Sequence, residues 1–408
     1  MKSRKIVSAS VASAIVAGTL LIPGVSMAQE PGIIRIYSSL PLTGSAAAQN
    51  ITVVNAINMA IEQKTKDGLI CDGKFKVEHV SLDDATAAKG QWDEAKEQEN
   101  ANKAVADPDA MAYIGTFNSG AAKISIPILN QANPPLAMIS PANTAVGLTK
   151  PANPGEPDVY YPTGERNYMR VVTADDIQGA VGAKWAKSLG VRSVFILDDQ
   201  QVYGKGLADV FEKTAREIGL KVLGRDGIDG KASDYKALAA KIKATNPQLI
   251  YFGGITQNNA GQLLKDLRAA GIKALFMGAD GILEKAFIEA AGTDIANGVL
   301  ATIAGTPRNR LPAAGQKFYK DYQAKYKSAP EAYAIYGYEA ASVVLKALST
   351  VCTKDRQAIL DAMLATKNFK GVLGTWSFTV NGDTTLSDML GNRVVKGEWK
   401  ETGLLKFP

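Results

Sequence analysis

Several polar side chains of this sequence stand just after short β-rich runs, where they could hold a small charged ligand. Ser119 follows an expected strand at 111–115 and precedes an expected helix at 121–131. A hydroxyl beside the free N–H groups of a helix N-terminus suits a carboxylate. An ordinary helix cap also explains this serine, and from this segment alone it is the simpler interpretation.

Two further strand ends carry polar groups. Ala142, Asn143 and Thr144 follow the next expected strand (136–140), and Asp280 follows a later one. Asp280 would place a carboxylate within reach of a ligand's ammonium group. Both segments also have an ordinary interpretation, because Pro/Asn and Asp-Gly sequences are common in surface turns.

An aromatic side chain follows a strand in the second half of the chain. Tyr203 lies in a glycine-containing segment after an expected strand at 193–198. It could cover an apolar ligand, or pack against its own lobe at the entry to a helix. Because ligands of open parallel sheets bind beyond the carboxyl ends of the strands, Tyr203 and the polar groups above are candidates for one shared site.

Signatures of hydrolases and nucleotide-binding proteins are absent from the sequence. There is no G-x-S-x-G around Ser119, no G-x-x-x-x-G-K-[ST], and no G-x-G-x-x-G between the first expected strand and helix. His79 is the sole histidine; it lies in an expected strand at 75–81 and is interpreted as structural or exposed. A secreted hydrolase using Ser119 stays a distant alternative, but it needs a base that His79 is poorly placed to supply.

The first 28 residues are typical of a secretory signal peptide. Lys2, Arg4 and Lys5 precede an apolar run at 6–22, and small residues lead to an expected cleavage site after Ala28. The run is too short and too polar for a membrane span, and no cysteine near the cleavage site could carry a lipid anchor. We therefore expect an exported, soluble protein that works away from cytoplasmic ATP and NAD and uses no cofactor.

Composition argues against a nucleic-acid-binding surface and against a metal site. The formal charge is +6, and removing the three basic residues of the signal leaves 6 − 3 = +3 over 408 − 28 = 380 residues. Basic and acidic residues are interleaved, without a basic stripe. Cys71 and Cys352 are the two cysteines of the chain. In an oxidising compartment, two lone cysteines favour one disulfide over a metal site, which would need more ligands nearby.

Strand-like and helix-like runs alternate in two series, which indicates two α/β lobes with helices on both faces of parallel sheets. The first series has expected strands at 33–37, 75–81, 111–115 and 136–140 and helices at 50–63, 91–105 and 121–131. A Pro-, Gly- and Asn-rich loop at 141–163 follows. The second series has strands at 193–198, 221–228, 249–252, 274–278 and 298–304 and helices at 177–189, 204–218, 235–245 and 258–270. Helices at 312–326, 332–348 and 356–367 and a strand at 375–380 are expected to complete the two lobes.

Taken together, these residues resemble the periplasmic branched-chain amino-acid-binding proteins of ABC transporters over essentially the whole chain after the signal. The order and spacing of six segments carry the resemblance: Pro41-Leu42-Thr43-Gly44, Tyr113-Ile114-Gly115 with Ser119, Ile139-Ser140-Pro141-Ala142-Asn143-Thr144, Tyr203-Gly204-Lys205-Gly206, Tyr251-Phe252-Gly253-Gly254 and Phe276-Met277-Gly278-Ala279-Asp280-Gly281. The resemblance implies a type I periplasmic binding protein: two doubly wound parallel-sheet lobes joined by three crossovers, near 171–173, 304–307 and 371–375. The implied lobes are 29–171 plus 306–372 and 173–304 plus 375–408.

The resemblance also implies roles for the candidate residues. In the family, residues at the positions of Ser119 and Thr144 hold an amino acid's carboxylate and ammonium, with the backbone at Ala142 assisting. An acid at the position of Asp280 closes on the ammonium from the second lobe, and an aromatic at that of Tyr203 contributes from the same side.

The chain departs from the family pattern in the expected side-chain pocket. Ile255 stands among the ligand-binding positions where a tyrosine commonly follows the paired glycines. The segment 44–50 lacks an aromatic that often covers the ligand, and the loop 141–163 is unusually long. The grip on an α-amino acid is therefore expected to be intact, while leucine, isoleucine and valine are candidates only.

The implied function is that of a monomeric periplasmic receptor that captures an amino acid between two closing lobes and delivers it to an ABC transporter permease. A receptor of the same fold for an amide, a urea or an aromatic carboxylate is the alternative. Asp280 argues against it, because a buried carboxylate without a cationic partner is costly. Family topology also returns the helix before Cys352 to the lobe that contains Cys71, so these two cysteines are expected to pair.

Overall fold

The computed structural model describes Met1 and residues 30–406, so residues 2–28 of the expected signal peptide lie outside the described residues. A six-stranded sheet with the order β2-β3-β1-β6-β7-β8 forms the centre of the first lobe. Its strands are β1 (Gly32–Leu40), β2 (Leu69–Ile70), β3 (Phe75–Asp83), β6 (Ala110–Gly115), β7 (Met138–Ser140) and β8 (Tyr168–Arg170). Neighbouring strands are parallel except β2 and β3. The four expected strands are confirmed here, with the fourth beginning at Met138, whereas β2 and β8 had not been predicted.

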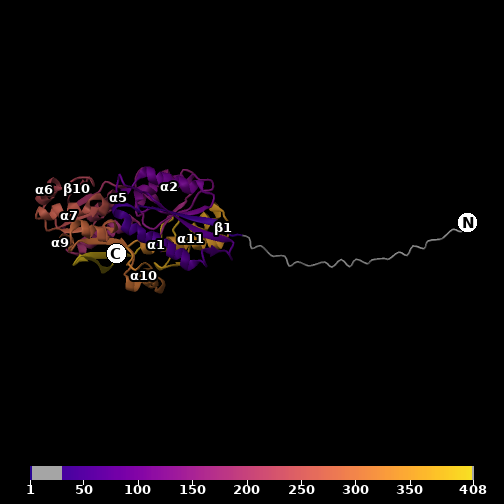
Figure 1. Cartoon of the computed structure of the whole chain (residues 1–408). Coiled ribbons are helices and arrows are strands. Elements are labelled where there is room, and N and C mark those ends of the chain that lie inside the picture. The colour runs from indigo at the N-terminus through magenta and orange to yellow at the C-terminus, as the bar shows by residue number, and fades with distance from the viewer. Residues whose placement is uncertain (2–29, 407–408) are drawn as a thin grey trace.

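Helices cover both faces of this sheet. The helices of the first lobe are α1 (Ala47–Lys64), α2 (Glu94–Ala106), α3 (Ser119–Asn130), α10 (Ala313–Tyr326), α11 (Ala334–Val351) and α12 (Arg356–Leu364). Ile36 on β1 joins Ile57 on α1 and Val344 on α11 in one buried cluster, while Tyr113 on β6 and Ile126 on α3 belong to another. Figure 1 shows the C-terminal α11 beside the indigo α1, although the two helices are far apart in sequence. The predicted return of the C-terminal helices to a lobe already begun is thus confirmed.

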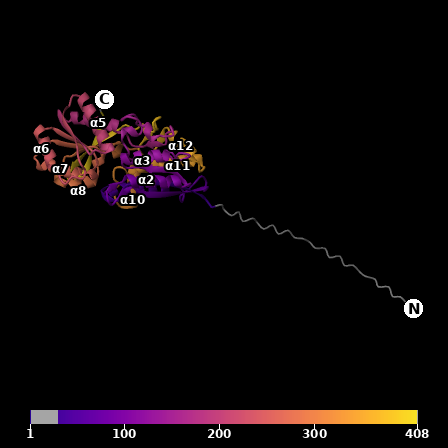
Figure 2. The ribbon, with the colours of Figure 1, turned by 90° about the horizontal axis from the view of Figure 1, so that it is seen from above.

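The second lobe has a seven-stranded sheet with the order β10-β9-β11-β12-β13-β16-β17. Its strands are β9 (Ser193–Asp198), β10 (Lys221–Gly227), β11 (Leu249–Gly253), β12 (Leu275–Gly278), β13 (Leu300–Ala304), β16 (Met389–Val395) and β17 (Glu398–Leu405). Its helices are α4 (Asp175–Ser188), α5 (Val202–Glu217), α6 (Lys236–Thr245), α7 (Ala260–Ala269), α8 (Lys285–Ala291) and α9 (Thr293–Ala296). Figure 2 shows α6, α7 and α8 in this lobe and α2, α3, α11 and α12 in the other. The two-lobe α/β architecture predicted from the alternation is confirmed.

Aromatic side chains fill much of the second lobe's interior. Phe252 and Phe276 on neighbouring strands lie 6.2 Å apart between ring centroids, and Phe287 on α8 continues the row. On the opposite face, Phe211 on α5 stacks on Tyr251 of β11 at 3.7 Å. Large rings buried on both faces fix how the helices pack on the sheet.

The C-terminal segment corrects two expectations. β15 (Thr375–Trp376) pairs with β14 (Phe369–Lys370), so the strand predicted at 375–380 ends at Trp376. Beyond Trp376, threonine hydroxyls accept hydrogen bonds from backbone N–H groups in place of a neighbouring strand. Thr379 Oγ1 accepts from Asn381 N and Asp383 N, and Thr385 Oγ1 accepts from Ser377 N. The antiparallel pairing of β13, β16 and β17 was also missed, so the second sheet is mixed rather than wholly parallel.

The long loop after β7 is folded against the first lobe. It contains the short helices η2 (Val146–Leu148) and η3 (Asp158–Tyr160). Glu156 holds it in place, accepting from Lys123 Nζ at 2.7 Å and from Tyr160 Oη at 2.7 Å. These contacts lower the pKa of Glu156 to about 2, although burial alone would raise it.

Cys71 and Cys352 lie together in the first lobe, with their Cα atoms 5.7 Å apart at a sequence separation of 281. Cys71 follows β2, and Cys352 directly follows α11. Their side chains have the geometry of a disulfide. Among the described residues, no helix has the length and apolar character needed to cross a membrane.

Candidate functional site

The first lobe contributes the loops that follow β6 and β7. Ser119 begins α3 and is 2% exposed, and its Oγ accepts from Ala145 N at 3.3 Å. The side chain of Asn143 donates to the carbonyl oxygens of Thr116 (2.8 Å) and Phe117 (3.0 Å). Asn143 therefore joins the two loops through their backbones.

Thr144 follows Asn143 directly in the loop after β7. Its hydroxyl is buried and has no hydrogen-bond partner among the described residues. Its carbonyl oxygen accepts from Asp175 N at 2.9 Å, at the start of α4 in the second lobe. A buried hydroxyl without a partner is costly unless a water or a ligand satisfies it.

The second lobe contributes one carboxylate with fixed neighbours. Asp280 begins the short helix η5 (Asp280–Ile282) after β12 and is 6% exposed. Its Oδ1 accepts from Tyr203 Oη at 3.0 Å and from Gln178 Nε2 at 2.5 Å. Gly281 N donates back to Tyr203 Oη at 3.1 Å. A side chain at Gly281 would lie 2.5 Å from the carbonyl oxygen of Gly254, so only glycine allows this close approach.

A residue of the first lobe reaches Asp280 across the site. Tyr333 directly precedes α11 and donates its hydroxyl to Asp280 Oδ2. Its ring meets Phe117 edge to face, with 5.6 Å between centroids. Sequence reasoning missed Tyr333, because it precedes a helix rather than following a strand and has no local motif. Gln178, one turn into α4, was missed for the same reason.

These groups surround a small cavity between the lobes, with a volume of about 20 Å³. Its lining includes five of the predicted residues: Ser119, Ala142, Tyr203, Ile255 and Asp280. Asn118, Phe117, Gly281 and Tyr333 complete the lining. Asn143 and Thr144, which directly follow Ala142 in sequence, are not part of the lining. A neighbouring space of about 10 Å³ is lined by Trp92 of the first lobe together with Asp199, Gln201 and Tyr203 of the second.

The charges at the site call for a cation. Burial raises the pKa of Asp280, although the hydroxyls of Tyr333 and Tyr203 oppose the shift. The pKa of Asp175 is also raised, first by its complete burial and then by the negative charge of Asp280. Both carboxylate oxygens of Asp175 lack a hydrogen bond of ordinary geometry among the described residues, and the nearby hydroxyl of Thr144 opposes the rise in pKa only in part. A cationic group bound beside Asp280 would lower the cost of ionising both acids.

Other candidate chemistry falls outside this site. His79 is partly buried, and its ring nitrogens lie 2.7 Å from Asn58 Oδ1 and 2.8 Å from Ser38 Oγ. Both nitrogens are engaged there, so His79 does not serve Ser119. Within residues 30–406 no three His, Cys, Asp or Glu side chains gather as metal ligands. A hollow of about 460 Å³ between Ile303, Ile335 and Trp399 contains none of the predicted site residues.

Comparison with known proteins agrees with this architecture. Residues 34–398 match the family model described as periplasmic binding protein. The Leu/Ile/Val-binding protein homolog 2 of Brucella abortus is 32% identical over 368 residues, which cover 90% of this chain and 91% of that protein. The crystal structure of the leucine-binding protein LivK of Thermotoga maritima has a TM-score of 0.79 and 26% identity, with 91% of this chain and 99% of that chain covered.

The branched-chain amino acid transporter substrate-binding protein LivJ of Streptococcus pneumoniae, solved in complex with isoleucine, has a TM-score of 0.78. It is 23% identical, with 91% of this chain and 98% of that chain covered, and so shares the fold. The family model spans nearly all of the described residues. The structure has the two lobes with largely parallel sheets, and the candidate site residues follow the ends of their strands. The chain is therefore a member of the periplasmic binding protein family.

Proposed function

We propose that this protein is the solute-binding receptor of an ABC importer and that it captures an α-amino acid between its two lobes. The observation that carries the proposal is the pairing of opposite chemistries across one buried cavity. Ser119, at the N-terminus of α3, suits a carboxylate, and Asp280 suits an ammonium group. A zwitterion satisfies both, whereas a ligand without a cation leaves Asp280 unpaired.

The cavity also supports an apolar side chain on the ligand. Phe117, Ile255, Tyr203 and Tyr333 supply carbon surface around the polar groups. The names of the relatives point the same way, since the Brucella abortus relative is called a Leu/Ile/Val-binding protein homologue. We therefore take leucine, isoleucine and valine as the first candidate ligands, and an amide, a urea or an aromatic carboxylate as less suited to the site.

Titration calorimetry with purified protein tests the proposal. Leucine, isoleucine and valine should bind, while benzoate and urea should not bind measurably at the same concentrations. Native mass spectrometry of protein taken directly from cells would identify a ligand carried through purification. Tight binding of benzoate or urea with no binding of any amino acid would contradict the amino-acid assignment.

The cellular setting forms part of the same proposal. We propose export to the periplasm through cleavage after Ala28, pairing of Cys71 with Cys352 in that oxidising compartment, and delivery of the solute by a monomer to a permease. Hinge closure around ligands is established for periplasmic binding proteins as a class. Small-angle scattering with and without leucine tests closure, because an unchanged radius of gyration at saturation would count against it.

The proposal also includes lobe boundaries that differ from the implied ones at the third crossover. The implied lobes end and resume at 372 and 375, yet the contacts of the following segment lie with the first lobe. Asp383 Oδ1 accepts from Thr149 Oγ1 at 2.9 Å, Gly382 O accepts from Arg170 N at 3.0 Å, and Leu386 packs against the core of the first lobe. These contacts support placing the third crossover at 387–388, just before β16.

A further inference from the structure

A buried ion pair lies directly behind the ligand-facing loop of the first lobe. Arg170 ends β8 and is 0% exposed, and its Nε lies 2.6 Å from Asp383 Oδ1. We propose that Arg170 and Asp383 are positioning residues of the ligand site. They fix the backbone around Thr144 and connect it to the segment that leads into the second lobe. The proposal rests on the function proposed above.

The remaining donors of Arg170 point to the loop itself. Nη1 donates to the carbonyl oxygens of Asn143 (3.2 Å) and Ala145 (2.8 Å), the two residues that flank Thr144. The carbonyl oxygen of Thr144 is held separately by Asp175 N. Three consecutive carbonyls therefore have fixed directions, and the peptide N–H of Thr144 has little freedom to turn. Five donors in a rigid fork make arginine suited to such a clamp.

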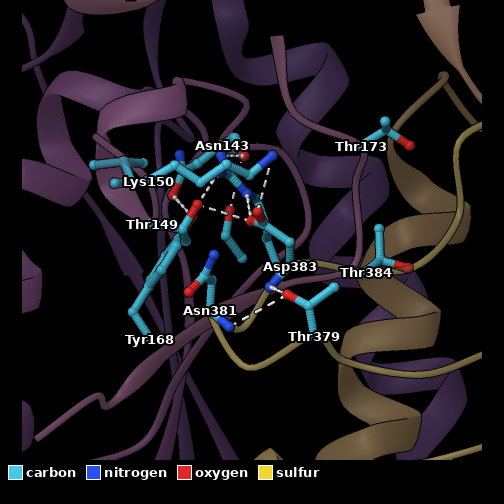
Figure 3. Close-up of polar contacts among 12 residues, drawn as sticks. Asn143, Thr149, Lys150, Tyr168, Thr173, Thr379, Asn381, Asp383 and Thr384 are labelled. Carbon is cyan, nitrogen blue, oxygen red and sulfur yellow. Dashed lines mark hydrogen bonds and ion pairs between the residues drawn. The ribbon is translucent and has the colours of Figure 1, made fainter. Parts of the chain in front are cut away.

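Asp383 is the charge that makes this clamp tolerable in the interior. A buried guanidinium without a counter-ion is strongly unfavourable. Asp383 Oδ1 also accepts from Thr149 Oγ1 at 2.9 Å, and its N donates to Thr379 Oγ1. Figure 3 shows Asp383 facing Thr149, Lys150 and Asn143, with Thr379 and Asn381 on the other side of the Asp383 loop. Burial alone would raise the pKa of Asp383, but Arg170 and Lys150 lower it, so the carboxylate stays ionised.

The same cluster contacts the second lobe. Lys150 Nζ lies 3.3 Å from Asp383 Oδ2 and 2.7 Å from Asp176 Oδ2, near the N-terminus of α4. Asp383 itself belongs to the segment that continues into β16 of the second sheet. Two of the chain connections between the lobes thus meet at the ion pair that holds the ligand loop. A change in the angle between the lobes therefore acts on the residues that set the loop, and closure and loop geometry are linked.

Affinity measurements on conservative variants test the proposal. Asp383→Asn and Thr149→Val remove the counter-ion or its hydroxyl support without touching the cavity lining. Each should weaken leucine binding at least tenfold in calorimetry. Asp107→Asn is the matched control, because it breaks another ion pair of the first lobe, Arg35–Asp107, which lies at the N-terminal end of β6 and so at the opposite end of that strand from the site. It should lower stability and leave affinity within twofold of wild type.

A double-mutant cycle separates positioning from general weakening. Asp383→Asn and Thr144→Ala both change the loop segment around Thr144. The affinity lost in the double variant should therefore be at least threefold smaller than the product of the two single losses. Asp383→Asn and Tyr203→Phe act on different lobes and should multiply within twofold. Equal coupling in both cycles, or unchanged affinity in Asp383→Asn, would overturn the proposal. If Asp383→Asn does not fold, the same cycles with Thr149→Val decide.

Hydrogen exchange of the ligand-free protein provides a readout that does not depend on any solute. The amides of Ala145 and Asp175, which bond to Ser119 Oγ and Thr144 O, should exchange faster in Asp383→Asn than in Asp107→Asn. Equal exchange in the two variants would overturn the positioning role. Faster exchange in a protein that binds no amino acid would support that role and contradict the proposed function instead.

Discussion

The first lobe holds its half of the site through backbone groups fixed from behind, whereas the second lobe presents side chains that bond to one another. In the first lobe, Asn143 and Arg170 donate to carbonyl oxygens of the loops that carry Ser119 and Thr144, and Arg170 is itself paired with Asp383. In the second lobe, Asp280 accepts directly from the side chains of Tyr203 and Gln178 at the cavity.

This difference suits the proposed function, in which the first lobe binds the carboxylate of the ligand and the second lobe its ammonium group. A carboxylate is bound by N–H and hydroxyl donors whose directions must be set in advance, which a rigid loop achieves at no further cost on binding. An ammonium group is bound by charge, which tolerates small shifts of the acceptor. The second lobe can therefore rely on an aromatic interior and one buried acid, while the first needs an internal polar framework.

The proposed disulfide would be the largest difference between the lobes, since both cysteines lie in the first lobe. Replacing Cys71 and Cys352 with serine should lower the free energy of unfolding by up to about 5 kcal/mol in the chain-entropy model. Denaturant titration of oxidised wild type and the double serine variant measures the loss. An unchanged midpoint, or free thiols on both cysteines in protein taken from the native compartment, would show that the first lobe has no such constraint.

A single substitution removes the negative charge that the second lobe places at the cavity. Asp280→Asn should weaken leucine binding by about 3 kcal/mol, because the ligand's ammonium loses its buried counter-ion. The ligand-free protein should not lose stability, since ionised Asp280 is unfavourably buried. Glu284→Gln, in a buried acid that does not line the cavity, is the control for calorimetry. Equal effects of the two variants would contradict the role of Asp280.

The first lobe's side chain in the cavity should matter somewhat less. Ser119→Ala removes one hydroxyl from the carboxylate position and should cost about 2 kcal/mol of binding free energy. Ser125→Ala, a buried serine of the same helix that donates to Ala121 O, provides the control. If both variants bind leucine like wild type, the carboxylate is held by backbone groups alone.

The smallest expected effect concerns the polar interior of the first lobe at acidic pH. Burial lowers the pKa of His79 to about 4, so the folded state keeps it neutral where the unfolded chain binds a proton. The stability that neutral His79 contributes is complete above about pH 6.5 and is lost as the pH falls towards 4. The stability difference between wild type and His79→Gln should therefore shrink over that window. A difference independent of pH would show that His79 does not titrate there.

Two features of the sequence predicted most of the fold and part of the site: the hydrophobic periodicity and the polar residues that follow the expected strands. Alternation located the parallel strands and their helices, and the rule that ligands lie beyond strand ends located Ser119 and Asp280. β16 and β17 were missed because Arg393, Lys396 and Lys400 interrupt any clear strand pattern. Tyr333 and Gln178 were missed because their role arises from the meeting of two lobes, which no local spacing records. Arg170 and Asp383 lie 213 residues apart, and nothing in either segment indicates the other.

One tryptophan gives this molecule a built-in optical reporter. The chain has four tryptophans, and Trp92 belongs to the first lobe yet lines a space with Asp199, Gln201 and Tyr203 of the second. Trp185 is buried inside the second lobe, and Trp376 is buried inside the first. Separation of the lobes would expose the indole of Trp92 to water while leaving those two in place. A red shift of emission on ligand removal, absent in Trp92→Phe, would let the angle between the lobes be followed in real time without any attached dye.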